Sequence, residues 1–313
     1  LEYDIESSLL PKGAMAALNH TDHLELHVPH PGACYFQDHI VKKLAMKSKA
    51  DLLVLDVFDL VHLAQHTFLR YLYFKGKDYD ISLDDLTEKE DKTTGILLNQ
   101  VSNKYTTLFR QALDSSCKKI IHLRDCAVMQ DAFTHLMLKS LVTAVEDLRQ
   151  RGQSLMILAT HSQKSSVKEQ FSGVFNNMHT REILPPLDKW NLWKDKMKMD
   201  ESKRIAEINA KGWVTFCHQK HTLKMHIPTH QDKLVDNLRN LPGMSDMVWS
   251  LQEVDRRAAV VMGHAIERQK NLLDFQDFKT VNSMLLSKPQ NMFEKATGTI
   301  QLDGNVDLEE LKE

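Results

Sequence analysis

Residues 118–163 read KKIIHLRDCAVMQDAFTHLMLKSLVTAVEDLRQRGQSLMILATHSQ, and their pattern of apolar residues indicates the class of fold. Two short apolar runs, at 120–123 and 155–159, flank a segment whose apolar residues recur every three or four positions, as in a helix. They are Phe133, Leu136, Met137, Leu141, Val145 and Leu148. Arg151 and Gly152 then end the helical pattern. The order strand, helix, strand is the repeating unit of a parallel sheet.

Polar residues follow both apolar runs. Arg124 and Asp125 follow the first, and Thr160, His161 and Ser162 follow the second. Ligands of such sheets bind beyond the carboxyl ends of the strands, so these residues are candidates for a site. Asp125 could hold a metal ion, cap the following segment or pair with Arg124. His161 could contact a phosphate or orient water, or it could simply be hydrogen-bonded.

The rest of the chain extends this pattern into an α/β fold of three layers around a parallel sheet. The predicted strands are 24–28, 51–55, 119–123, 154–159 and 181–184. Helices are predicted between them, among them Val57–Leu72 and 96–114. After Pro185 and Pro186 the pattern becomes helical. The predicted helices there are 188–219, 230–241, 251–269 (with Ser250 as its cap) and 274–286.

The composition and the breaks predict four regions. Residues 1–22 form a lead-in segment that can hold one short helix. Residues 23–187 form the α/β domain, in which 76–95 is a polar insertion. Residues 188–288 form a small helical domain. Residues 289–313 form a polar tail.

The bulk properties exclude some functional classes. The chain has 313 residues and a formal net charge of −2, which gives no indication of nucleic acid or an anionic membrane as a partner. It has four cysteines and no CxxC pair, which favours a reducing, intracellular location. No apolar run approaches the roughly 20 residues that span a bilayer. No signal peptide is visible, but the chain begins with Leu1, so a preceding segment stays open.

Metal binding and nucleophilic catalysis are weakly indicated. The candidate metal ligands are Cys217, His218, His221, His226 and His230. Without a CxxC pair beside them, a polar connector is favoured, and no metal site is expected. A nucleophile could be Ser162 beside His161, or Cys126 beside Asp125. The G-x-S-x-G turn that usually presents such a nucleophile is absent from the sequence.

The lysine-rich helix at 189–204 could contact an acidic partner, although its interleaved acidic residues favour a solvated face.

The turn after the first strand occupies the place of a phosphate-binding loop. Such a loop has the pattern G-x-x-x-x-G-K-[ST], in which Lys reaches the phosphates and the hydroxyl binds Mg²⁺. Here the sequence is PHPGACYF, residues 29–36. Gly32 is its only glycine, while Tyr35 and Phe36 replace Lys and Ser/Thr. Neutral aromatic side chains cannot balance a triphosphate, so a structural turn is expected.

The end of the third strand departs from a catalytic pattern in a similar way. A nucleotide-hydrolysing site would place Asp-Glu here, with Asp on Mg²⁺ and Glu activating the attacking water. This chain has Asp125 followed by Cys126. A cysteine is a poor substitute for that base, so Asp125 lacks the neighbour that would make it catalytic.

Taken in order, these parts resemble an AAA+ ATPase module over about residues 20–285. The resemblance is carried by the P-x-P-G turn at 29–32, Asp125, the ATHS sequence at 159–162 and REILPPL at 181–187, followed by a helical region. The sequence WSLQEVDRRAAVVMGHA at 249–265 looks like the family's lid helix. The chain is similar in particular to the degenerate first module of fungal AAA proteins related to the mitochondrial outer-membrane extraction ATPase.

The resemblance implies a nucleotide site that has lost its usual residues. Tyr35 and Phe36 stand at the Walker A Lys and Ser/Thr positions, Cys126 at the catalytic Glu, and His161 at the sensor Asn. The arginine finger would fall within 175–180, which contains no arginine, and Arg181 is the nearest. The degenerate site positions are Gly32, Cys34, Tyr35, Phe36, Asp125, Cys126 and His161, and no catalytic residue is expected.

The implied function is a catalytically inactive structural or interaction domain of a larger AAA+ protein or assembly. Its partners would be other protein subunits or a second AAA+ module, and a mitochondrial location follows from the resemblance alone. No cofactor is expected, with ATP or ADP and Mg²⁺ as the alternative. One alternative function is an ATP-hydrolysing remodeller whose intact motifs lie in residues outside this sequence. The other is a pure protein-interaction scaffold that binds no nucleotide.

Overall fold

The computed structural model describes most of the chain. The described residues are 1–10, 22–56, 58–60, 63, 92–126, 132–162, 174–175, 178–184, 187–219 and 231–287. Several predicted features lie wholly or largely outside them. These are the helix Val57–Leu72, the insertion at 76–95, the histidines from His221 to His230, and the tail 289–313.

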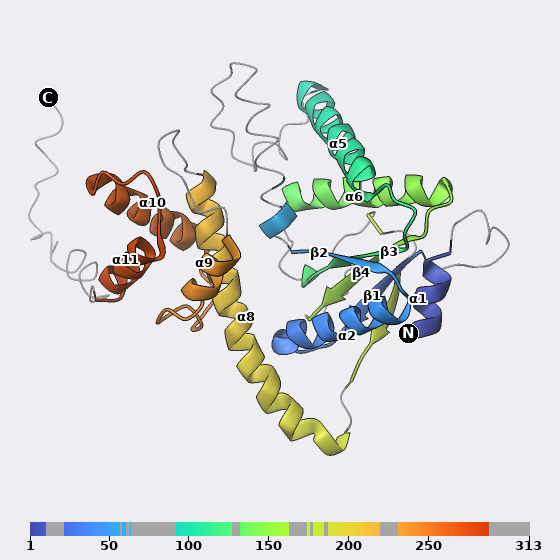
Figure 1. Ribbon diagram of the computed structural model, residues 1–313, viewed down its shortest axis with the longest axis horizontal. Helices are drawn as coiled ribbons and strands as arrows, with labels where there is room; N and C mark the ends of the chain where they lie inside the picture. The colour runs from blue at the N-terminus through green and yellow to red at the C-terminus, as the bar shows by residue number, and fades with distance from the viewer. Residues whose placement is uncertain are drawn as a thin grey trace, which may run out of the picture.

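Five parallel strands form one sheet in the order β2-β3-β4-β1-β5, which confirms the predicted α/β class (Figure 1). The strands are β1 (His23–His27), β2 (Asp51–Leu55), β3 (Lys119–Leu123), β4 (Leu155–His161) and β5 (Met178–Glu182). The fifth strand begins three residues before the predicted 181–184. The start of the strand was not predicted because its sequence, MHTRE, is mostly polar. A strand at the edge of a sheet need not be apolar on both faces.

Helices cover both faces of the sheet (Figure 1). On one face lie α5 (Lys92–Leu113) and α6 (Ala132–Gln150), and on the other lie α1 (Glu2–Ser8) and α2 (Cys34–Lys47). Side chains alternate between the two cores, as the pleat requires. Ile121 and Ile157 pack with α5 and α6, while Ile120 and Met156 pack with α1 and α2.

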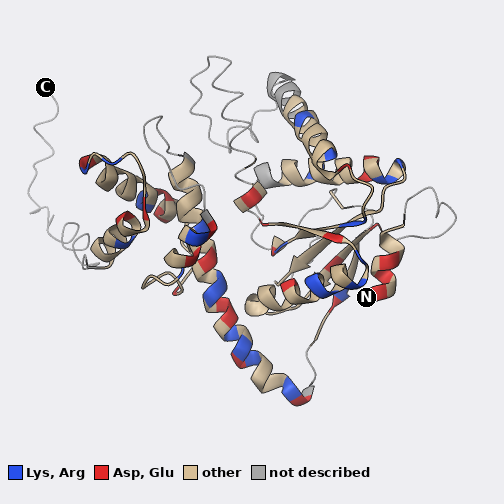
Figure 2. Ribbon diagram, in the orientation of Figure 1, with Lys and Arg blue, Asp and Glu red and all other residues tan. Residues whose placement is uncertain are grey.

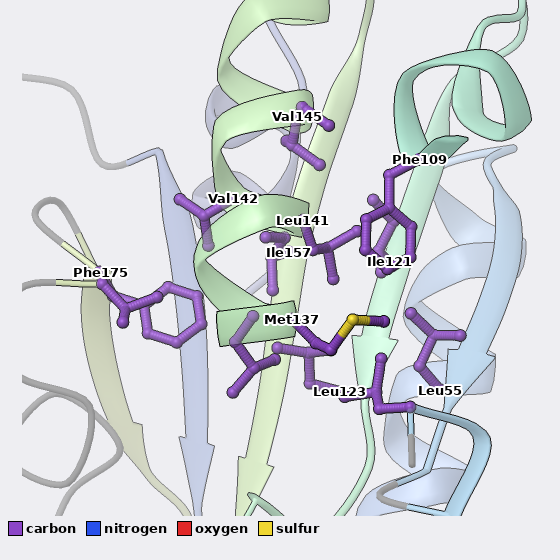
Figure 3. Packing of buried hydrophobic residues seen from close by; sticks show 14 of the residues in the cluster. Leu55, Phe109, Ile121, Leu123, Met137, Leu141, Val142, Val145, Ile157 and Phe175 are labelled. Atoms are coloured by element: carbon purple, nitrogen blue, oxygen red, sulfur yellow. The ribbon is translucent and has the colours of Figure 1, made fainter. Parts of the chain in front are cut away.

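The stretch 118–163 forms the predicted strand, helix and strand. Met137, Leu141 and Val145 of α6 point toward the sheet and pack in one cluster with Leu123 and Ile157 (Figure 3). The end of α6 has a physical cause at Gly152, whose φ is +90°. Its N–H donates to the Arg149 carbonyl at 3.0 Å, and the Gln153 N–H donates to Leu148 at 3.1 Å. These bonds satisfy the last helical carbonyls, and the left-handed backbone suits glycine.

The C-terminal part is helical, as predicted. Its elements are η4 (Leu187–Lys189), α8 (Trp190–Gln219), α9 (Gln231–Leu238), α10 (Leu251–Glu267) and α11 (Phe275–Ser287). Ser250 caps α10, because its Oγ accepts a hydrogen bond from the Glu253 N–H at 3.2 Å. The core of this part includes Cys217, and its Trp213 ring lies 5.0 Å from that of Phe278.

Helix α8 belongs to both parts of the molecule. It contacts the short 3-10 turn η2 (Pro31–Ala33) and α2 on the α/β side, and α9 and α10 on the helical side (Figure 1). Its contact with η2 brings it to the carboxyl edge of the sheet. None of the described helices is long and apolar enough to cross a membrane.

Candidate functional site at the carboxyl edge of the sheet

The turn between β1 and α2 is closed by its own hydrogen bonds. The Gly32 N–H donates to His30 Nδ1 at 3.1 Å, and the Ala33 N–H donates to the His30 carbonyl at 2.9 Å. A phosphate loop would instead point such amides at its ligand. Gln37 of α2 ties the turn to the sheet, since its Nε2 donates to the carbonyls of Leu26 and His161 at 3.0 and 2.8 Å.

The backbone of α8 lies directly on this turn. A Cβ atom added at Gly32 would lie 1.7 Å from the carbonyl oxygen of Met197. Gly32 is therefore needed for the close approach of a helix. The Met197 side chain is buried with Val28 and Ala33, and Phe36 packs against the same cluster. Phe36, which the sequence resemblance placed at the Ser/Thr position of the motif, is thus a packing residue in the structure.

Arg124, at the end of β3, is surrounded by three carboxylates. Its Nε lies 2.8 Å from Asp38 Oδ2, and its Nη1 lies 3.1 Å from Asp56 Oδ2 and 2.8 Å from Glu207 Oε1. Asp38 comes from α2, Asp56 follows β2, and Glu207 comes from α8. The arginine side chain is 8% exposed, so these pairs are largely shielded from water.

Arg204 of α8 makes a second set of pairs beside the first. Its Nε lies 2.9 Å from Asp125 Oδ2, and its Nη1 lies 3.1 Å from Asp56 Oδ2. Lys211, two turns further along α8, lies 3.2 Å from both Asp56 and Glu207. We call the seven residues the ion cluster: Arg124, Arg204, Lys211, Asp38, Asp56, Asp125 and Glu207.

The charges of the ion cluster are divided between the two parts of the molecule. The α/β part contributes Arg124 and three aspartates, and its formal share is therefore −2. Helix α8 contributes Arg204, Lys211 and Glu207, a formal share of +1. Helix α8 therefore supplies the charge that the edge of the sheet lacks.

The pKa values of the carboxyl groups follow from this arrangement. Burial alone would raise the pKa of Glu207, but the hydrogen bond from Arg124 and the nearby cations hold it well below its usual range. The pKa of Asp56 is also lowered, because Arg204, Lys211 and Arg124 together outweigh its burial. At Asp38 burial is the larger effect, and the pKa is raised.

Tyr35, which the sequence resemblance placed at the Lys position of the motif, contacts α8. Its hydroxyl donates to Glu207 Oε2 at 2.9 Å, and the Arg124 guanidinium lies 5.4 Å from its ring centroid. Burial and the Glu207 carboxylate raise the pKa of Tyr35, so the phenol stays neutral at ordinary pH. Tyr35 thus contacts two members of the ion cluster, Glu207 and Arg124, and adds no charge to it.

Asp125 is fixed by three neighbours, Thr160, Ser162 and Arg204. Its φ of +52° is left-handed, a conformation that aspartate tolerates better than most residues. Its N–H donates to Thr160 Oγ1 at 3.0 Å, and Ser162 Oγ donates to its carboxylate at 3.2 Å. The other carboxylate oxygen pairs with Arg204. Of the roles suggested by the sequence, ion pairing is present, but its partner comes from α8 and not from the neighbouring Arg124.

The remaining sequence-predicted positions are packed into the fold. Burial, with the charges of Asp125 and Glu25, raises the pKa of Cys126 well above its usual value, and its Sγ lies 3.6 Å from the Leu123 carbonyl. Burial also raises the pKa of Cys34. His161 is buried, and its carbonyl accepts from Gln37 and from the Val28 N–H.

Arg181 does not reach the ion cluster through any of its observed pairs. It lies on β5 and is exposed, and its Nε lies 2.9 Å from Asp4 Oδ2 of α1.

Among the described residues, no group of three or more His, Cys, Asp or Glu side chains has an arrangement that could hold a metal ion.

The sequence reasoning missed most of the ion cluster. Asp38, Asp56, Arg204, Glu207 and Lys211 were not singled out. A signal existed for the last three, because positions 204, 207 and 211 share one face of a helix. In a segment dense in lysine and acidic residues, that face could not be told from a solvated one.

Comparisons with known proteins leave the family open. No family model matches the chain, and no curated protein matches it. Among solved structures it is similar to the structure of C. elegans PCH-2, with a TM-score of 0.30 and 10% sequence identity over 92% of this chain and 68% of that chain. A TM-score this low does not establish a common fold.

Proposed function

We propose that this chain is a catalytically degenerate AAA+-type module that serves as a structural or interaction domain of a larger AAA+ protein or assembly. The sequence resemblance suggests the family, and a parallel sheet followed by a helical part agrees with it. The observation that carries the proposal is the position of α8. Its Arg204 and Glu207 pair with Asp125 and Arg124, where a nucleotide's phosphates and Mg²⁺ would be expected.

The charges argue against a bound nucleotide in this arrangement. A triphosphate needs free cations and backbone N–H donors. Arg124 is paired with three carboxylates, and the Gly32 amide is used within its own turn. If α8 moved away, the α/β part of the cluster would keep Arg124 and three aspartates. Its formal charge of −2 would then repel an anion.

Catalysis would also lack its usual groups. Activation of water requires a base, and the buried Cys126 thiol, whose pKa is raised, does not provide one. Asp125 is paired with Arg204, and Arg181 is paired with Asp4 on the surface. Loss of positioning, water activation and charge stabilisation together favours a structural role.

The structural role that the geometry supports is to hold two parts in a fixed orientation. Helix α8 spans 30 residues and packs on both the α/β part and the helical part. The ion cluster and the contact between Gly32 and Met197 fix its register against the sheet. A partner would thus meet one defined surface.

Steady-state phosphate release with MgATP tests this function. We expect the purified chain to show no turnover above a protein-free blank, and Asp125→Ala to leave that background unchanged. Clear turnover in the wild-type chain that Asp125→Ala abolishes would refute the proposal. Circular dichroism on both proteins ensures that a folded variant is being compared.

A further inference from the structure

We propose that the N-terminal half of α8 is a docking surface for an acidic amphipathic helix of a partner protein. This inference rests on the proposed role as an interaction domain, and it names the chemistry of the partner. The surface consists of Leu192, Lys196, Met199 and Lys203, which we call the α8 seam. Their spacing of four, three and four residues places them on one face of the helix.

The α8 seam continues a face that is already used for helix packing. The same alternation of three and four residues leads from Lys203 to positions in the second half of α8, namely Ala206, Ala210, Trp213 and Cys217. All four are buried in the core of the helical part. Helices α9 and α10 pack on α8 in this region. One face of a single helix is therefore covered over its second half and open over its first.

The open half combines apolar contact area with positive charge. Leu192 is 74% exposed and Met199 is 65% exposed. The side chains of Lys196 and Lys203 are 67% and 60% exposed, and both pair with the one buried carboxylate of Asp200. Two cations that share one anion leave a positive excess. Figure 2 shows basic and acidic residues interleaved along this half of α8, which extends away from the rest of the helical part.

The neighbouring face of this half-helix is already occupied. Met197 is buried against the turn at Gly32, Trp193 packs beside it, and Arg204 lies in the ion cluster. The α8 seam is thus displayed by a helix that the fold holds in place, so little ordering is required on binding. A helix packs best against positions spaced by three and four, which favours a helical partner. The lysines favour glutamate or aspartate beside its apolar residues.

A designed peptide provides the probe. It is a helix of about 20 residues, with leucines spaced alternately by three and four and glutamates on both sides of them. Fluorescence anisotropy with the whole 313-residue chain at low salt measures its affinity. We expect saturable binding that weakens at least about tenfold in Met199→Glu and in Lys196→Glu.

A matched control lies on the same helix. Lys198→Glu makes the same change of charge as Lys196→Glu, but position 198 lies off the α8 seam and should leave the affinity within about twofold. If Lys196→Glu and Lys198→Glu lose the same affinity for the peptide, the effect depends only on the net charge of the chain, and the proposal is overturned. Equal binding of a peptide with lysines in place of the glutamates would overturn it as well. Circular dichroism melts check that each variant is folded.

Two other occupants are separated by further measurements. If sedimentation shows self-association that Met199→Glu abolishes, the surface belongs to a second copy of this chain and the partner assignment is wrong. If a peptide of residues 303–313 binds as tightly as the probe and loses affinity in Met199→Glu, the acidic end of this chain is the occupant. ATP turnover would refute the proposed function and leave the probe binding intact. If the wild-type chain shows no ATP turnover and does not bind the designed peptide, only the docking surface is refuted.

Discussion

Arg204 Nε of α8 lies 2.9 Å from Asp125 Oδ2 at the end of β3, and both side chains are buried. This pair joins the helical part of the chain to the carboxyl edge of the sheet. Burial makes each charge depend on the other, because water cannot replace a lost partner.

Arg204→Met should destabilise the chain strongly, because it leaves Asp125 and Asp56 with less compensating charge. Removing one partner of a buried pair typically costs about 3–5 kcal/mol. Urea unfolding followed by circular dichroism measures the loss. Lys203→Met is the matched control, since its side chain is exposed and should change the free energy of unfolding by less than about 1 kcal/mol. Equal effects at both positions would contradict a buried cluster.

Gly32→Ala should destabilise the chain because its new methyl group would collide with the Met197 carbonyl oxygen. The helix backbone must move, and overpacking of this kind costs about 1–3 kcal/mol or more. Gly263→Ala in α10 makes the same chemical change with no heavy atom within 4 Å. It should stabilise the helix by up to about 1 kcal/mol. The melting temperature should therefore fall in Gly32→Ala and rise slightly in Gly263→Ala. An unchanged or raised melting temperature in Gly32→Ala would exclude the predicted collision.

Stability should fall at acid pH partly through Glu207. Its pKa is lower in the folded chain than in the unfolded one, so its contribution is present above the unfolded value of about 4.3. The contribution is lost as the pH falls toward the folded value. Asp56 acts in the same direction, whereas the raised pKa of Asp38 opposes it. Urea midpoints between pH 7 and pH 3 should fall less steeply in Glu207→Gln than in wild type. Parallel curves would argue against the coupling.

Restoring the missing motif residues should not restore nucleotide binding. The double variant Tyr35→Lys and Phe36→Ser supplies the Lys and hydroxyl that the loop lacks. The turn would still be covered by α8 at Met197, and the inserted Lys would face Glu207. We expect no thermal shift with MgATP in this folded variant. A shift of several degrees would mean that these two side chains alone prevent binding.

The sequence predicted the scaffold well where local pattern decides structure. The apolar spacing in 118–163 predicted β3, α6 and β4, and Ser250 predicted the start of α10. Strand β5 was placed three residues late, because its position depends on pairing with β1 and not on its own polar residues.

The site was predicted less completely, because its partners lie far apart in the chain. Tyr35 and Asp125 were identified, as were Thr160 and Ser162, which hydrogen-bond to Asp125. Glu207, the partner of Tyr35, and Arg204, the ionic partner of Asp125, were not. Arg204 is separated from Asp125 by 79 positions. No local pattern distinguishes a buried arginine that pairs across two parts of a fold from an exposed one on a solvated helix.

Titration calorimetry with MgATP and MgADP tests the central claim most directly, namely that α8 occupies the carboxyl edge of the sheet in place of a nucleotide. The account predicts no saturable heat with the wild-type chain at nucleotide concentrations up to about 1 mM, where a Kd of that order would be detected. It also predicts no saturable heat with Arg204→Met, provided circular dichroism shows that this variant is folded. Arg124 and the three aspartates at the edge of the sheet would still carry a net negative charge. Saturable binding of one nucleotide per chain to the wild type would contradict it.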